Sequence, residues 1–310
     1  MIHVESLTRS YGSLKAVDDV SFLVQPGEIV GLLGHNGAGK TTIMKMMTGF
    51  LEPTSGSITI EHLQMVLDRR AIQARMGYLA ENCPLYPDMT VVAYLAYLAA
   101  LHGVAADRLG GLLRLALERT ALVDKAEQQI GTLSRGYRQR VGVAQAILHQ
   151  PRILILDEPT NGLDPAQIQH MRSLLRELAR ESTLIISTHI LQEVEAVCDR
   201  VIIIQQGRKV IDTRLDALRA GKRLLVTIED QDDPAAFLAG LQGVTMVERQ
   251  GSAKGRLRLA LSGTMAPEEL APMIATAVVK RGLRLYRLET ETPSLEKIFR
   301  EINTISGRDQ

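Results

Sequence analysis

Residues 34–42 read Gly34-His35-Asn36-Gly37-Ala38-Gly39-Lys40-Thr41-Thr42, and this stretch decides the fold. It fits the pattern G-x-x-x-x-G-K-[ST], with the apolar run Ile29–Leu33 before it and a predicted helix, Ile43–Phe50, after it. In that context the glycines let the backbone turn its N–H groups toward phosphate oxygens at a helix N-terminus. We therefore expect Lys40 to reach the β- and γ-phosphates of a nucleotide, and the Thr41 hydroxyl to bind Mg²⁺.

A second motif carries acidic residues. Ile153–Leu156 is a continuous apolar run of the kind found in strands covered on both faces, and Asp157 and Glu158 follow it directly. Ligands of α/β sheets bind at the carboxyl ends of the strands. We expect Asp157 to hold Mg²⁺, directly or through water, and Glu158 to accept a proton from the attacking water or to orient it. Alone, two adjacent acids at a strand end fit a helix-entry cap equally well.

The pattern between these motifs and after them indicates an α/β core. Short strands dominate the first 35 residues or so, with polar residues between the apolar ones. Helical periodicity then fills an insertion, with helices expected at Val91–Leu101, Gly111–Thr120 and Gly136–His149. Beyond it, the expected strands Leu184–Ser187 and Val201–Ile204 alternate with the expected helices Ala166–Arg180 and Leu191–Val197. This alternation predicts a parallel sheet.

The composition changes after Gly221. Strands are expected at Leu224–Glu229, Val244–Arg249, Arg256–Leu261 and Leu283–Glu289, and helices at Pro234–Leu241 and Pro267–Arg281. This order is that of a split βαβ, ferredoxin-like α+β unit, and a closing helix is expected at Ser294–Ile302. The predicted domains are therefore a core over residues 1–219, with its helical part at about 82–150, and an accessory domain over 221–310.

Composition excludes several classes of protein. Lys plus Arg total 36 against 35 acids, so the net charge of +1 gives no general attraction to nucleic acid or anionic lipid. Aromatic residues make up only 4% of the chain and there is no Trp, which disfavours a base-stacking surface. Cys83 and Cys198 form neither a CxxC pair nor a Cys/His cluster, so no disulfide scaffold or zinc site is expected. The longest apolar window, Val91–Leu101, is shorter than a membrane span, and the N-terminus does not resemble a signal peptide.

The segment Leu133-Ser134-Arg135-Gly136-Tyr137-Arg138-Gln139-Arg140 resembles the LSGGQ signature of ATP-binding cassette (ABC) proteins, and it stands in the family's order between the two motifs above. Ser134 as helix N-cap and Gly136 offer a hydroxyl and bare N–H groups to a phosphate. Arg135 and Tyr137 depart from the consensus Gly and Gln.

The remaining motifs of the family also have counterparts. Tyr11 lies where the family stacks an aromatic ring on adenine, and residues 162–164 resemble the D-loop. His189 resembles the switch histidine that contacts the γ-phosphate. Glu81 replaces the usual Gln between the core and the helical insertion; its carboxylate is still an oxygen ligand for Mg²⁺, although it adds negative charge beside ATP.

Together with Glu81 and the signature, residues 84–90 and 292–299 resemble the ATPase subunits of type-2 ABC exporters, particularly the gliding-motility type. The resemblance is specific over residues 1 to about 219 and looser beyond. It implies a P-loop (RecA-like) core with an N-terminal antiparallel β-subdomain and a helical insertion. It also implies a head-to-tail homodimer that closes two Mg-ATP between residues 34–42 of one subunit and 134–136 of the other. A separate membrane permease and a cytoplasmic location on the inner face of the membrane follow from it.

Two other functions stay open. A soluble ABC protein that acts on ribosomes or DNA is disfavoured, because such proteins carry two cassettes or a long coiled coil and this chain shows neither. A regulatory subunit that binds ATP but hardly hydrolyses it is disfavoured by Glu158 and His189, although Glu81 keeps it open. The tail carries no motif with a chemical mechanism; an add-on that extends the dimer contact or rests on the core is favoured over a ligand-sensing domain.

Overall fold

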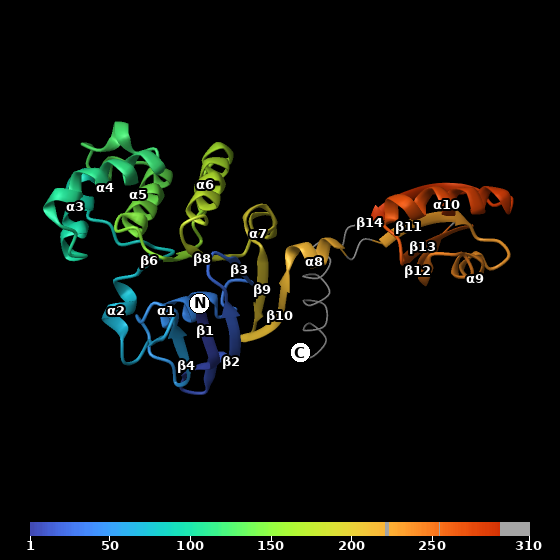
Figure 1. Cartoon of the computed structure of the whole chain (residues 1–310), viewed down its shortest axis with the longest axis horizontal. Helices are drawn as coiled ribbons and strands as arrows, with labels where there is room; N and C mark the ends of the chain where they lie inside the picture. Colours follow the sequence, from blue (N-terminus) through green and yellow to red (C-terminus); the bar gives the residue numbers. More distant parts are fainter. Residues whose placement is uncertain (221–222, 254, 292–310) are drawn as a thin grey trace. The chain divides into compact units, whose positions relative to one another are not determined.

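The computed structural model describes residues 1–220, 223–253 and 255–291. The chain divides into two compact units, the first covering Met1–Arg214 and the second beginning at Leu215 (Figure 1). This division falls a few residues before the boundary expected at 219. In the described ranges no helix is long and apolar enough to cross a bilayer.

An antiparallel sheet opens the first unit. Its four strands run in the order β2 (Leu14–Val24), β1 (Ile2–Tyr11), β4 (Ser55–Ile60) and β5 (Leu63–Gln64). Strand β1 alternates at its start because Ile2 and Val4 are fully buried while His3 is only partly covered. Both β1 and β2 are longer than the short alternating runs of the sequence predict.

The second sheet of this unit is mainly parallel and holds both nucleotide motifs. Its order is β10 (Arg208–Arg214), β9 (Arg200–Gln205), β3 (Ile29–Leu33), β8 (Thr183–Thr188), β7 (Ile153–Asp157) and β6 (Met76–Leu79). Only β10 is antiparallel to its neighbour. The expected parallel core is therefore confirmed, and the two edge strands β6 and β10 are additions.

Strand β6 corrects an expectation. The sequence predicts no strand just before Glu81, which was expected only to join the core to the helical insertion, but Met76–Leu79 pairs in parallel with Ile153–Leu156 of β7. The strand can approach helix α5 (Arg135–Ile147) closely because Gly77 has no side chain: a Cβ there would lie 2.0 Å from the Ala146 carbonyl oxygen.

Helix α1 (Lys40–Met47) also starts earlier than the expected Ile43, directly after Gly39, and ends before Gly49. The other helices that flank this sheet are α6 (Pro165–Leu178) and α7 (Leu191–Val197). Asp164 begins α6 with a capping box, which explains why the helix starts at Pro165.

The helical insertion lies between β6 and β7. It contains α3 (Val91–Leu101), α4 (Ala106–Arg119), two short 3-10 turns at Val123–Lys125 and Ile130–Thr132, and α5. Figure 1 shows α3, α4 and α5 gathered together, apart from β1, β2 and β4. Helix α4 begins at Ala106, five residues before the expected Gly111. The sequence pattern missed its first turn because Gly110 and Gly111, which are exposed, interrupt the apolar periodicity there. A short helix, α2 (Arg69–Gln73), precedes β6 and was not predicted.

The second unit holds a four-stranded antiparallel sheet. After α8 (Leu215–Ala220) come β11 (Arg223–Glu229), α9 (Pro234–Ala239), β12 (Val244–Ala253), β13 (Arg256–Gly263), α10 (Pro267–Lys280) and β14 (Leu285–Glu291). The order β12-β13-β11-β14 is that of the split βαβ unit. Leu257, Leu259 and Leu261 are buried, and Arg256 and Arg258 are exposed, as expected. The expected helix Ser294–Ile302 lies outside the described residues.

Candidate functional site

The loop over residues 34–40 is built against two backbone segments from elsewhere in the chain. Gly39 has φ +108°, and a Cβ there would lie 2.6 Å from the Ala16 carbonyl oxygen. Gly207, in the turn between β9 and β10, donates its N–H to Ala38 O at 2.9 Å and accepts from the Asp18 N–H at 2.8 Å. Only glycine fits both positions, so the loop takes the curled shape that its sequence predicts.

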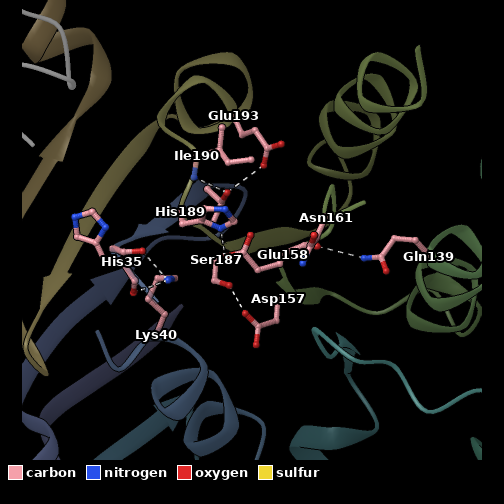
Figure 2. Close-up of polar contacts among 12 residues, drawn as sticks. His35, Lys40, Gln139, Asp157, Glu158, Asn161, Ser187, His189, Ile190 and Glu193 are labelled. Carbon is pink, nitrogen blue, oxygen red and sulfur yellow. Dashed lines mark hydrogen bonds and ion pairs between the residues drawn. The ribbon is translucent and has the colours of Figure 1, made fainter. Parts of the chain in front are cut away.

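Lys40 lies at the centre of this loop. Its ammonium donates to the carbonyl oxygens of Gly34 at 2.7 Å and His35 at 3.1 Å (Figure 2), and the residue is only 5% exposed. Burial lowers the pKa of Lys40 below its ordinary value, while the carboxylates of Glu158, Asp157 and Glu81 act in the opposite direction. A cation held beside three acids can meet phosphate oxygens without leaving the loop.

Asp157 ends β7 and is fully buried. One carboxylate oxygen accepts a hydrogen bond from the Ser187 hydroxyl of β8, while Oδ2 is buried and receives no hydrogen bond from the described part of the chain. A buried carboxylate oxygen without a donor fits a cation such as Mg²⁺. Across the described ranges no group of three or more His, Cys, Asp or Glu side chains is placed to hold a metal ion.

Glu158 follows Asp157 and takes a left-handed backbone conformation, with φ +51°. Its N–H donates to Ser187 O at 3.1 Å, and its Oε1 lies 2.9 Å from His189 Nδ1 (Figure 2). Burial raises the pKa of Glu158 above its ordinary value, and His189 and Lys40 work against this rise. A buried carboxylate beside an imidazole is suited to proton transfer from a bound water.

His189 is oriented by residues that the sequence did not single out. The Thr188 hydroxyl accepts from the Ile190 N–H at 3.0 Å and donates to Glu193 Oε2 at 3.1 Å (Figure 2). Glu193 is itself buried in α7. These bonds tie the end of β8 to the next helix and so fix where His189 stands.

One cleft brings most of the expected ligands together. It has a volume of about 290 Å³. Its lining comprises Ala16, Asn36, Gly37, Gly39, Lys40, Thr41, Thr42, Glu81 and Glu158. Gly34, His35, Ala38, Asp157 and His189 lie around it through the contacts described above. The acid at position 81 thus faces the same cleft as the phosphate loop and the candidate base.

Three further expected ligands, Tyr11, Ser134 and Gly136, neither line the cleft nor belong to the contacts described above. Tyr11 is half exposed, and the Arg9 guanidinium lies 4.7 Å from its ring centroid. Ser134 caps α5 by accepting from the Tyr137 N–H at 3.4 Å, as the sequence predicts. Gly136 is buried in the next turn, where a Cβ would meet the Gln167 side chain at 2.4 Å.

The chain resembles known proteins over nearly all of its length. Residues 17–161 match the family model described as ABC transporter. The ABC transporter ATP-binding protein YdbJ of Bacillus subtilis is 36% identical, with 98% of this chain and 96% of that protein covered. The bacitracin transport ATP-binding protein BcrA of Bacillus licheniformis is 38% identical, with 77% of this chain and 78% of that protein covered.

Solved structures agree. The ATP-binding subunit of an ABC transporter superposes with a TM-score of 0.66 at 30% identity, covering 71% of this chain and 92% of that one. A dimeric ATP-binding cassette bound to ADP and phosphate gives a TM-score of 0.64 at 22% identity, covering 69% of this chain and 99% of that one, and shows the fold alone. Both nucleotide motifs follow the carboxyl ends of interior strands, β3 and β7, and the matches above show that the chain belongs to the ABC transporter family as an ATP-binding subunit.

Proposed function

We propose that the chain is the ATPase of a type-2 ABC exporter, related to the gliding-motility subunits, and that it powers export through a separate permease. The observation that carries this proposal is the cleft in which Lys40, Glu81 and Glu158 meet. A relative named for export supports the direction of transport: the Nod factor export ATP-binding protein I of Burkholderia thailandensis is 39% identical, with 68% of this chain and 70% of that protein covered. We take residues 1–219 as the nucleotide-binding domain, with its helical part at about 82–150, and 221–310 as an accessory domain.

In this proposal the phosphate loop and the acids divide the work. Residues 34–42 bind the phosphates of ATP through backbone N–H groups, Lys40 neutralises the β- and γ-phosphates, and Tyr11 stacks on adenine. Thr41, Asp157 and Glu81 hold Mg²⁺, which offsets phosphate charge when bound. Glu158 takes the proton of the attacking water, and His189 orients that carboxylate and contacts the γ-phosphate.

The proposed homodimer follows from what the cleft lacks. Ser134 and Gly136 lie at the N-terminus of α5 but do not line the cleft of their own subunit. A second copy placed head to tail brings these donors to the phosphates from the open side. Closure on ATP and opening after hydrolysis then supply the movement that the permease uses.

A groove in the first unit suits the permease contact. It has a volume of about 630 Å³ and lies between the core and the insertion. Phe50, Tyr78, Pro84 and Leu98 are among its lining residues. Tyr86 and Tyr97 are exposed and form a ring pair at 6.1 Å between centroids. We propose that residues 82–97 contact the permease here, which places the chain on the cytoplasmic face of the membrane.

A reversal of charge within residues 82–97 tests this contact. Asp88→Lys should reduce pull-down of the chain by its co-expressed permease, whereas Asp107→Lys on α4 serves as the matched control. Unchanged recovery of Asp88→Lys, or membrane binding without any permease, contradicts the assignment.

The second candidate function is a regulatory ABC subunit that binds ATP but turns it over very slowly. Glu81 favours it, because an extra carboxylate in the cleft repels phosphate unless a cation lies between them. Steady-state phosphate release by the purified chain separates the two candidates: sustained turnover supports the transport ATPase, and binding without turnover supports the regulatory subunit.

Glu158→Gln tests the proposed mechanism most sharply. The amide keeps the shape of the carboxylate but cannot take a proton, so chemistry stops while ATP still binds. Light scattering should show a monomer-to-dimer shift with Mg-ATP and none with ADP. The double variant Glu158→Gln/Ser134→Arg should stay monomeric, because bulk blocks the end of α5. Turnover at the wild-type rate contradicts the role of Glu158, and an inactive but monomeric variant contradicts the role of Ser134.

A further inference from the structure

We propose that Arg135 and Gln139 are positioning residues that hold the Glu158 carboxylate in place from the helical insertion, and we call the pair the α5 clamp. The proposal rests on the catalytic role proposed for Glu158. It concerns contacts within one subunit, between the first turns of α5 and the segment Glu158–Gly162 that follows β7.

Gln139 provides the first contact of the clamp. Its Nε2 donates to the carbonyl oxygen of Glu158 at 3.3 Å (Figure 2). It also donates to the carbonyl oxygen of Pro159, at 3.2 Å. The Glu158 carbonyl oxygen also accepts from the Asn161 N–H at 3.1 Å. Gln139 therefore binds the backbone of the candidate base itself.

Arg135 provides the second contact. Its Nη2 donates to Asn161 Oδ1 at 3.2 Å. Its side chain also packs against Gly162, where a Cβ would come within 2.4 Å of Arg135 Nε. Gly162 has φ +77°, so the turn that receives the guanidinium needs a glycine for both its backbone and its space.

The two side chains reach the same segment because they stand four residues apart on one helix, which places them on one face. The other basic residues nearby make different contacts. Arg138 donates to Leu133 O at 2.8 Å, and the Arg140 guanidinium lies 5.3 Å from the Tyr137 ring centroid. The contacts with residues 158–162 are therefore made by the side chains at positions 135 and 139, and the neighbouring arginines at 138 and 140 contact other groups.

The clamp fixes the Glu158 peptide from two sides. Its N–H is bound by Ser187 O of β8, and its carbonyl oxygen is bound by Gln139 of α5. A left-handed residue such as Glu158, with φ +51°, persists only where its surroundings hold it. Because the insertion supplies one of these bonds, displacement of α5 should move the carboxylate while the phosphate loop stays intact.

The experiment compares turnover with nucleotide affinity in the full-length chain. In Gln139→Glu a carboxylate replaces the donor and faces two carbonyl oxygens. We expect kcat to fall about tenfold, since small misplacements of a reacting group are costly, while the Kd of a fluorescent ATP analogue with Mg²⁺ changes less than about twofold. Gln128→Glu, an exposed change of the same charge in the insertion, is the matched control and should behave as the wild type.

A double-mutant cycle tests the Arg135 contact. Arg135→Ala and Asn161→Ala should each lower kcat about threefold, and the double variant should be no slower than the slower single variant, because both remove one contact. Arg135→Lys should keep most of the wild-type kcat that Arg135→Ala loses. The control is Arg114→Ala, which changes an exposed arginine of α4. If the kcat losses of the two single variants multiply in the double variant, Arg135 acts elsewhere, such as on the partner's nucleotide, and its part in the clamp is overturned.

The remaining outcomes are equally decisive. Provided that the wild-type chain hydrolyses ATP, two results overturn the clamp: a wild-type kcat in Gln139→Glu, or a loss of nucleotide affinity as large as the loss of turnover. A wild-type chain that binds ATP but never hydrolyses it overturns the proposed function and the clamp with it.

Discussion

The two units of the chain differ in what they bury. Among the described residues, every buried charged side chain lies in the first unit: Glu28, Lys40, Asp157, Glu158 and Glu193. The core of the second unit is built from aliphatic side chains, and its charges stay on the surface, as in the Arg258–Glu289 pair at 3.4 Å. Burial of charge costs stability unless a partner compensates. The comparison teaches that the first unit accepts this cost, in part where Lys40, Asp157 and Glu158 meet at the cleft, whereas the core of the second unit buries only uncharged side chains among the described residues.

The largest effect should come from removing the buried cation of the first unit. Lys40→Ala leaves the phosphate charge without its counter-ion, so ATP turnover should fall about 100-fold or more. The fold should survive, because the side-chain hydrogen bonds of Lys40 within the described part of the chain go to carbonyl oxygens of its own loop. Phosphate release and circular dichroism check the two statements. An unfolded variant, or wild-type turnover, would break the contrast between ligand-serving and packing residues.

Truncation of a buried side chain in the second unit should affect stability instead. Leu259 is fully buried in the sheet, and Leu259→Ala should destabilise this unit by about 2–5 kcal/mol. ATP affinity should remain that of the wild type, because no nucleotide motif lies in this unit. Thermal unfolding should show the loss. A large drop in ATP affinity in a folded sample argues that the units share the site.

Removal of the second unit sharpens the same contrast. A chain that ends at Arg219 keeps both sheets of the first unit and the whole cleft. Its affinity for Mg-ATP, measured by calorimetry, should change less than about twofold, because the truncated chain retains every residue that lines the cleft. Loss of binding in a folded truncation is the outcome that this view does not allow.

The smallest effect concerns a titratable group outside the cleft. The ring centroids of His149 and His102 lie 4.0 Å apart in a stacked pair. Burial, and to a smaller extent the charge of the nearby His102, lower the pKa of His149 from 6.5 to about 4. Between these values the unfolded chain binds a proton that the folded chain refuses, so stability should fall as pH drops from 6.5 to 4. In His149→Phe, chemical denaturation should show a shallower dependence over this window. An unchanged slope assigns the acid sensitivity to other groups.

Motifs that act through local backbone were predictable from sequence. The motif pattern located residues 34–42 and the apolar run Ile153–Leu156 located Asp157, while the resemblance of residues 133–140 to the LSGGQ signature pointed to the Ser134 cap. Periodicity also located α3 and α7 with their observed bounds. Edge strand β6 was missed since its pairing partner lies far along the chain, and only that pairing distinguishes Met76–Leu79 from a loop.

Contacts between distant side chains were beyond the sequence. Nothing local links Gln139 to Glu158 or Ser187 to Asp157, although each pair helps to position the site. The four-residue spacing of Arg135 and Gln139 was the one available signal, and it shows a shared face but not what that face touches. The contact of Tyr11 with adenine stays a prediction.

The turn at Gly207 has a consequence for mutagenesis. It supports the phosphate loop through main-chain atoms alone, by its bonds to Ala38 and Asp18. Truncating side chains one at a time to alanine removes none of these atoms, so such a scan is blind to this support. Only an addition can reveal it: Gly207→Ala places a methyl group 2.8 Å from the Ala16 carbonyl oxygen, at φ +78°. Part of the support of the phosphate loop thus comes from a residue that has no side chain to truncate.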